Sequence, residues 1–318
     1  MKAETEVVQG ADKQFKTKKT KRNDRSSSHL RETLAGLAFV GPMLIGTSIL
    51  VLFPMVASFI LSFTDWNFVS GYTNATFVGF ENFITLFNND VFLKSLGNNF
   101  ILIIAIPIGL VISLGIAVII NKYIYFKDVF KVIFFMPFIS SVVAVAVVFR
   151  VLFHPSQGPV NQFLMSLGFE NPPGWIADTA FSLPSVMIIM IWTSIGFNLI
   201  IYLAGLQNIP KELYEAAQID GASAWYQFTK ITVPLVSTTT FFLLVAGVIS
   251  SFKMFDLILV LTNGGPANST MIPVVYLYEQ AFLELKTGYA SAIALVMFII
   301  ILIITYIQFV GQKKWVNY

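Results

Sequence analysis

Six long apolar runs most strongly constrain what this chain of 318 residues can fold into. A helix needs roughly 20 residues to cross the hydrocarbon core of a bilayer, and each run is long enough. Lipid offers no partner for an unpaired backbone group, so the spanning segments are expected to be helices. The runs also lack the alternation that marks the strands of a β-barrel. They cover residues 34–63, 100–120, 132–153, 183–206, 235–262 and 289–310.

The composition agrees with this pattern and excludes a soluble globular chain. Hydrophobic residues make up 56% of the sequence and charged residues only 12%. We therefore predict an all-α polytopic membrane protein with six transmembrane helices and no separate soluble domain. The first run exceeds the length of a straight span, so we expect that helix to tilt or to extend beyond the membrane.

The positions of Lys and Arg predict the orientation. Nine of them fall in the first 31 residues, three in 121–131, two in 207–234 and two after residue 310. The loops on the other side hold only Lys94 and Lys286, while Arg150 and Lys253 fall inside predicted helices. Because positive charge gathers on the cytosolic side, both termini and the segment 207–234 are expected in the cytosol.

This topology divides the chain into three parts. Residues 1–32 form a basic tail whose polar composition predicts disorder, residues 33–312 form the membrane domain, and residues 313–318 form a cytosolic tail. A cleavable signal peptide is not expected, because the tail is long and the first run exceeds a typical signal core. The net charge of +3 does not imply a nucleic-acid partner, because the basic tail can bind anionic lipid headgroups instead. The absence of Cys excludes disulfides and thiolate metal sites.

The polar segment between the fourth and fifth runs, residues 208–234, is longer than a simple connection requires. Pro210 suits the first turn of a helix and Gly221 can end it. A second helix, which Pro234 would stop, then follows. This order predicts a docking element, although an amphipathic loop on the membrane surface would fit the same residues. The apolar stripe of the second helix consists of Trp225, Phe228 and Ile231.

The motifs in this segment resemble those of a known family. Glu215-Ala216-Ala217 followed by Asp220-Gly221-Ala222 resembles the EAA loop of importer permeases of the ATP-binding cassette (ABC) class. The surrounding sequence is similar to the branch of that family that imports carbohydrates, with maltose-type and glycerol-phosphate-type members. Further matching segments are, in order, FTDW (63–66), GFENF (79–83), LTNGGP (261–266) and GYASA (288–292).

The resemblance implies a type I ABC importer permease in the cell (cytoplasmic) membrane. It implies four kinds of partner: a second, homologous permease, a cytosolic ATPase dimer, an extracytoplasmic sugar-binding protein and a carbohydrate substrate. The sequence contains no GxxxxGK[ST] motif, so ATP hydrolysis would reside on the separate ATPase. The chain itself would be no enzyme and would need neither cofactor nor metal. The implied ATPase-coupling residues are Glu215, Ala216, Ala217, Asp220, Gly221 and Ala222.

Polar and small residues inside the fourth and fifth runs share helical faces. Such stripes usually serve helix packing, but hydroxyls beside an aromatic ring also suit a sugar. With the EAA and NGGP motifs in register, the family's sugar-contacting positions fall on these stripes. The resemblance therefore implies a substrate path lined by Thr193, Ser194 and Phe197 in the fourth run and by Gly247, Ser250, Ser251 and Met254 in the fifth.

Two charged residues, Lys253 and Asp256, lie at the predicted membrane depth, where each charge costs roughly 2.5–3.5 kcal/mol. Three residues apart on one helix face, they could neutralise one another. Pairing with a neighbouring subunit and contact with a ligand are the alternatives. Arg150 is expected to reach the outer interface.

Two other functional classes fit the sequence less well. An ion-gradient-driven secondary transporter would favour inverted repeats and broken helices, and no convincing repeat is present. An intramembrane enzyme would need a catalytic cluster, but His29 and His154 are isolated and no paired carboxylates lie at membrane depth. A scaffold without transport would not need the polar stripes.

Overall fold

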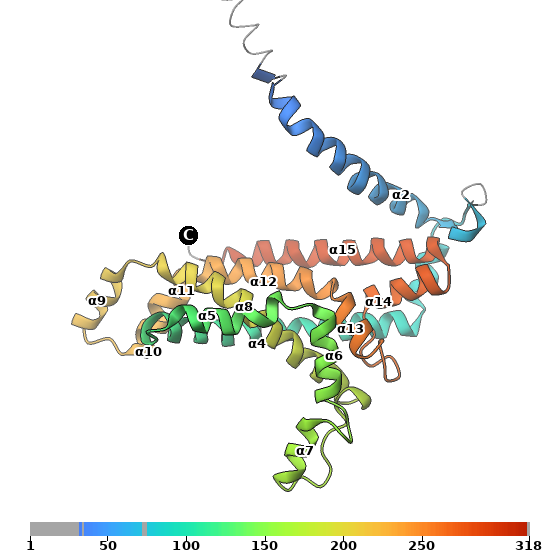
Figure 1. Ribbon diagram of the computed structural model, residues 1–318. Helices are drawn as coiled ribbons and strands as arrows, with labels where there is room; N and C mark the ends of the chain where they lie inside the picture. Colours follow the sequence, from blue (N-terminus) through green and yellow to red (C-terminus); the bar gives the residue numbers. More distant parts are fainter. Residues whose placement is uncertain (1–31, 34, 72–74, 317–318) are drawn as a thin grey trace, which may run out of the picture. The chain divides into compact units, whose positions relative to one another are not determined.

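The computed structural model describes residues 32–33, 35–71 and 75–316, and these are mostly helical (Figure 1). The chain divides into two compact units, Met1–Ala57 and Ser58–Tyr318. Almost all of the predicted N-terminal tail lies outside the described residues, as do residues 317–318 at the other end.

Within the described residues, four continuous helices are long and apolar enough to cross a membrane. Two bent helix pairs pass the same test when each pair is taken together, which raises the number of possible spans to six. These six units follow the order of the predicted apolar runs. The continuous helices are Ala35–Leu61, Asp90–Lys122, Ser182–Gln207 and Thr287–Gln312.

The first of these helices contains no charged residue. Its second half consists of the π-helical turn η1 (Ser48–Leu52) and the α-helix α2 (Phe53–Leu61). A helix that is apolar on every side is suited to lipid rather than to water. The chain leaves it at Leu61 and enters a two-stranded antiparallel sheet, in which β1 (Thr64–Asp65) pairs with β2 (Thr76–Phe77).

Three long helices of the second unit run side by side with the main helix of the fifth apolar run, Ser237–Phe252 (Figure 1). α4 (Asp90–Tyr123) begins where the side chain of Asn89 accepts a hydrogen bond from the backbone N–H of Phe92. It packs along α8 (Ser182–Gln207), and buried Leu, Ile, Val and Tyr side chains fill the space between them. The last long helix is α15 (Thr287–Gln312).

The third apolar run does not form the continuous helix that the sequence predicts. It forms α5 (Lys127–Ile139) and α6 (Val142–Leu152), which are bent by 92°. Ser140 and Ser141 between them have extended backbones, and the Ser140 hydroxyl donates to the carbonyl oxygen of Met136. Hydropathy gives the length of an apolar run but not its local direction, so the run predicted a span without predicting the bend inside it.

The fifth run is also broken. Its main helix, α12 (Ser237–Phe252), ends directly before Lys253, and α13 (Phe255–Leu261) begins after Met254. On the other side, α12 is bent by 63° from the preceding helical segment, Ala224–Leu235. The predicted single helix over 235–262 is therefore a chain of shorter pieces. That preceding segment consists of α10 (Ala224–Gln227), the π-helical turn η5 (Phe228–Thr232) and α11 (Val233–Leu235).

Short elements make up the connections between the long helices. The segment around Phe83 and Ile84 forms the short helix α3. These elements are the 3₁₀ turn η2 (Phe68–Ser70), α3 (Glu81–Phe87), α7 (Pro159–Ser166), the 3₁₀ turn η4 (Trp175–Ala177), α9 (Lys211–Ile219), α14 (Pro273–Tyr278) and the π-helical turn η6 (Glu279–Leu283).

Gly196 lets α8 approach α5 closely. A Cβ atom at this position would meet the carbonyl oxygen of Phe134 and would lie 2.7 Å from the Cα of Phe135. Both are backbone atoms, so the neighbour cannot move aside by changing a rotamer. Any larger side chain must push the two helices apart.

We therefore expect Gly196→Ala to lower the thermal unfolding temperature of the purified protein in detergent. Overpacking of this kind typically costs roughly 1–3 kcal/mol. Gly97→Ala is the matched control, because Gly97 is exposed in α4 and nothing lies within 4 Å of its added Cβ. Equal unfolding temperatures for the two variants would contradict the close approach.

Candidate functional site

The segment that resembles the EAA loop begins with helix α9. Pro210 lies directly before its first residue, and the helix ends at Ile219. Gly221 follows with φ of +77°, a left-handed conformation that glycine adopts without strain. The backbone N–H of Gly221 donates to Gln218, and that of Ala222 donates to Ala217, over 3.0 and 2.8 Å. The prediction that Gly221 ends this helix is confirmed.

The second helix of the segment departs from the prediction at its far end. Ser223 caps it by accepting a hydrogen bond from the backbone N–H of Tyr226. Pro234 does not stop it, because this residue occupies the first turn of α11, where a missing N–H is tolerated. The helical segment continues to Leu235 and bends into α12.

Large apolar side chains are exposed on this segment. Ile219 is 86% exposed and Trp225 is 72% exposed, whereas Phe228 and Ile231 pack against the hydrophobic core. The predicted apolar stripe of the second helix is thus divided, since Trp225 is exposed while Phe228 and Ile231 face the core. Exposed apolar groups gathered on a polar loop are typical of a protein contact surface. Of the six predicted coupling residues, Ala217 and Ala222 are half-buried, and the exposed ones are Glu215, Ala216, Asp220 and Gly221.

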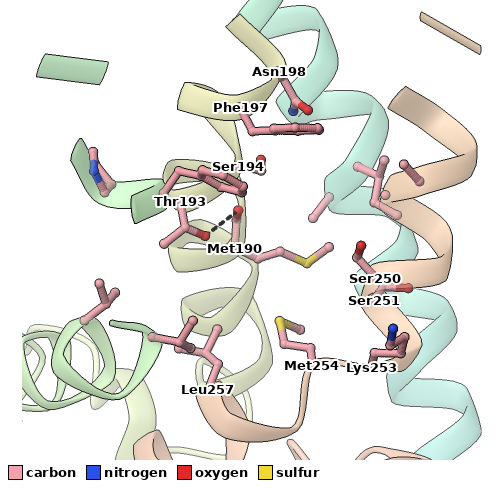
Figure 2. A pocket seen from close by; sticks show the side chains of 18 of the residues that line it. Met190, Thr193, Ser194, Phe197, Asn198, Ser250, Ser251, Lys253, Met254 and Leu257 are labelled. Atoms are coloured by element: carbon pink, nitrogen blue, oxygen red, sulfur yellow. Dashed lines mark hydrogen bonds between the residues drawn. The ribbon is translucent and has the colours of Figure 1, made fainter. Parts of the chain in front are cut away.

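A cavity of about 340 Å³ lies in the second unit, among α4, α8, α12 and the breaks of the two bent segments. Figure 2 shows side chains from α8 on one side facing those from α12 on the other. All seven residues of the predicted substrate path line this cavity. They are Thr193, Ser194 and Phe197 of α8, Gly247, Ser250 and Ser251 of α12, and Met254 of the break.

The cavity exists because two helix breaks face it. Ser140 and Val142 border the break between α5 and α6, and both line the cavity. Lys253 and Met254 form the break between α12 and α13 and line it as well. A broken helix presents loop residues where a continuous helix would fill the space with side chains.

The hydroxyl groups of the wall are oriented by their own helices. Thr193 donates to the carbonyl oxygens of Ile189 and Met190 at 3.0 Å, the second of which is drawn in Figure 2. Ser194 and Ser251 donate to carbonyls of their own helices at 2.9 and 2.8 Å. Their hydrogens are used within the helix, but each oxygen keeps a lone pair that can accept a hydrogen bond from a ligand hydroxyl.

An aromatic surface accompanies these hydroxyls. The rings of Phe138 and Phe197 both line the cavity and stack at 5.1 Å with an interplanar angle of 25°. Phe138 was missed by sequence reasoning, because it stands in an unbroken apolar run where nothing distinguishes it from its neighbours. Pro137 and the two following serines are the signal that could have located the break.

The structure separates the two serines of the fifth run. Ser250 is exposed, whereas Ser251 is only 1% exposed. Adjacent positions on a helix point about 100° apart, so one serine faces the opening and the other faces the helix packing. Ser250 is therefore the more direct member of the predicted stripe.

Lys253 and Asp256 do not pair with each other as the sequence suggested. The helix breaks between them, so they do not share a helix face, and both are exposed residues that line the cavity. The salt bridges in the described part of the chain, Lys131–Asp128 and Lys286–Glu284, involve neither of them. Arg150 lies exposed in the last turn of α6.

Comparison with known proteins shows the family. Residues 105–315 match the family described as the binding-protein-dependent transport system inner membrane component, and the chain belongs to it. The chain is 35% identical over 299 residues to the probable ABC transporter permease protein YesP of Bacillus subtilis, covering 92% of this chain and 95% of that protein. It is 34% identical to the arabinooligosaccharides transport system permease protein AraP of the same organism, covering 85% and 86%.

The fold is also that of a chain in a solved ABC transporter structure. A chain of a bacterial ABC transporter involved in the import of the acidic polysaccharide alginate aligns with a TM-score of 0.81, covering 92% of this chain and all of that one. The sequence identity is 24%, so this likeness shows the fold. The chain is accordingly a permease subunit of the ABC transporter class and a multi-pass membrane protein.

Proposed function

We propose that this chain is one of two membrane subunits of an ABC importer for a sugar or oligosaccharide. The observation that carries the proposal is the cavity, where the two polar stripes and a stacked aromatic pair meet. Oriented hydroxyl oxygens and an aromatic face suit the O–H groups and the C–H face of a sugar. Relatives named as permeases for arabino-oligosaccharides and for lactose support the substrate class.

The segment 207–234 is proposed as the contact with the ATPase. Its exposed carboxylate at Glu215, its glycine turn and its exposed Ile219 and Trp225 provide polar and apolar groups for a protein cleft. ATP hydrolysis would occur on the partner ATPase dimer, whose closure would rock the helices as rigid bodies. A second, homologous permease would complete the pathway, and an external binding protein would deliver the sugar.

A direct test is uptake by proteoliposomes that contain this chain, its second permease and its ATPase, with the binding protein outside. Labelled lactose, arabino-oligosaccharides and alginate oligosaccharides serve as probes. We expect uptake of at least one probe that requires ATP inside and persists when ionophores remove ion gradients. Uptake that follows an ion gradient without ATP would instead support a secondary transporter.

We propose that the permease lies in the cytoplasmic membrane. It would cross this membrane six times, with both termini in the cytosol. The sequence contains no Cys, so single introduced cysteines report their positions without background. We expect Ala222→Cys and Asn268→Cys to react with a membrane-impermeant maleimide from opposite sides. The uneven distribution of Lys and Arg is the physical reason. If both cysteines reacted from the same side, the six-span topology would be wrong, because one predicted span would not cross the membrane.

A further inference from the structure

Helix α9 is weakly attached to the rest of the second unit. None of its nine residues is fully buried. Tyr214 is the large side chain of α9 that packs against the hydrophobic core, while Leu213 and Ile219 are exposed. A helix held mainly by one side chain needs a further connection if it is to move other parts of the protein.

Tyr214 supplies such a connection through its hydroxyl. Its Oη lies 2.9 Å from the Oγ1 of Thr232, and either oxygen can be the donor. Thr232 is 4% exposed, so this hydrogen bond is shielded from water at one end. The part of the loop after the Gly221 turn is held by a separate hydrogen bond, because the side-chain amide of Gln227 donates to the carbonyl oxygen of Ala222 at 3.1 Å.

Thr232 belongs to the segment that enters the cavity wall. It ends η5, and α11 and α12 follow it along the chain. α12 carries Gly247, Ser250 and Ser251 of the cavity. The backbone route from α9 to η5 instead passes through the turn at Gly221, where glycine provides little stiffness.

We propose that the Tyr214–Thr232 hydrogen bond makes α9 and η5 move as one body, so that a displacement of α9 reaches the cavity. Tyr214 and Thr232 are then positioning residues, and this role rests on the proposed function of the loop. Tyr214→Phe removes only the hydroxyl and keeps the ring in the core. Thr232→Val removes the hydroxyl of the partner, and Thr232→Ser restores an oxygen at the same position.

The test measures how accessible the cavity is to a small reagent, and it requires no sugar. The complex with its second permease and ATPase carries Ser250→Cys as reporter, and the rate of its reaction with N-ethylmaleimide is measured before and after trapping with ATP and vanadate. We expect trapping to change this rate several-fold. In complexes with Tyr214→Phe or Thr232→Val, most of that several-fold change should be lost, because the hydrogen bond that links α9 to η5 is absent. Trapping of the nucleotide itself should persist.

Three comparisons decide the outcome. The double variant should be no worse than Thr232→Val, which removes the bond to Tyr214 together with the 3.4 Å bond that the Thr232 hydroxyl donates to the carbonyl oxygen of Gln227. Thr232→Ser should respond like the reference, and so should Tyr226→Phe, which removes the hydroxyl of a Tyr that is 54% exposed in the same loop. A full response in Tyr214→Phe would overturn the cross-link and leave the proposed function standing. If trapping left the reference itself unchanged, the proposed ATP-driven movement of this cavity would be wrong.

Discussion

Replacement of Gly221 by Trp is expected to reduce ATP-driven transport strongly while the protein still inserts into the membrane. The φ of +77° at this position costs a bulky L-residue roughly 1–2 kcal/mol, so the turn that follows α9 would open. Nothing lies within 4 Å of a Cβ added here, so the variant should not disturb the core. Uptake into proteoliposomes and ATP hydrolysis by the assembled complex are the measurements. At least a tenfold loss of uptake is expected, since about 1.4 kcal/mol corresponds to a factor of ten in an equilibrium constant.

A matched glycine exists at the end of another short helix. Gly168 follows α7 with φ of +94°, and its position is also open, with nothing within 4 Å of an added Cβ. Gly168→Trp carries the same kind of backbone cost outside the proposed contact with the ATPase, so it should assemble and transport. Gly221→Asn should retain much of the activity, because Asn tolerates the left-handed region. Normal transport by Gly221→Trp would contradict the docking role of the loop.

Replacement of Ser250 by Trp is the second change with a large expected effect. An indole ring would occupy a substantial part of the cavity of about 340 Å³ that this exposed serine lines. Uptake should fall at least tenfold, whereas assembly and basal ATP hydrolysis should persist, because the change blocks the path without touching the loop. The same substitution at Ser251 should impair assembly as well, since Ser251 is buried and overpacking a core costs about 1–3 kcal/mol.

The control for Ser250→Trp is Ile303→Trp. Ile303 is 51% exposed in α15 and does not line the cavity. A tryptophan there should change uptake little. If Ser250→Trp transported normally, the sugar would have to pass by another route, and the partner permease would be the place to look.

The sequence predicted the helical class of the fold and the members of the candidate site better than it predicted the path of the chain. Helical spacing placed Ser250 on one stripe and Thr193 and Phe197 on another, and the family resemblance implied that the two stripes form one substrate path. The structure brings all three residues to one cavity. The left-handed turn at Gly221 was predictable because only one residue type adopts it freely. These features depend on local chemistry, which a single sequence contains.

The helix breaks depend on longer-range packing and were not predicted. The 92° bend at Ser140 and Ser141 interrupts a run whose hydropathy is continuous. Lys253 and Asp256 looked like partners on one helix face, but the break between α12 and α13 separates them. The two charges were the sequence signal for this break, because charged residues inside an apolar run are tolerated where the chain borders a cavity.

The 63° bend between the loop helices and α12 has a mechanical consequence. Because the angle exceeds 45°, a push directed along Ala224–Leu235 is transmitted mostly across the axis of α12 and less along it. α12 packs against α4, α8 and α15, so it would tilt among these neighbours instead of sliding past them. If the proposed ATPase contact pushes on Ala224–Leu235, this bend would convert the push into a sideways displacement of the cavity wall that α12 forms.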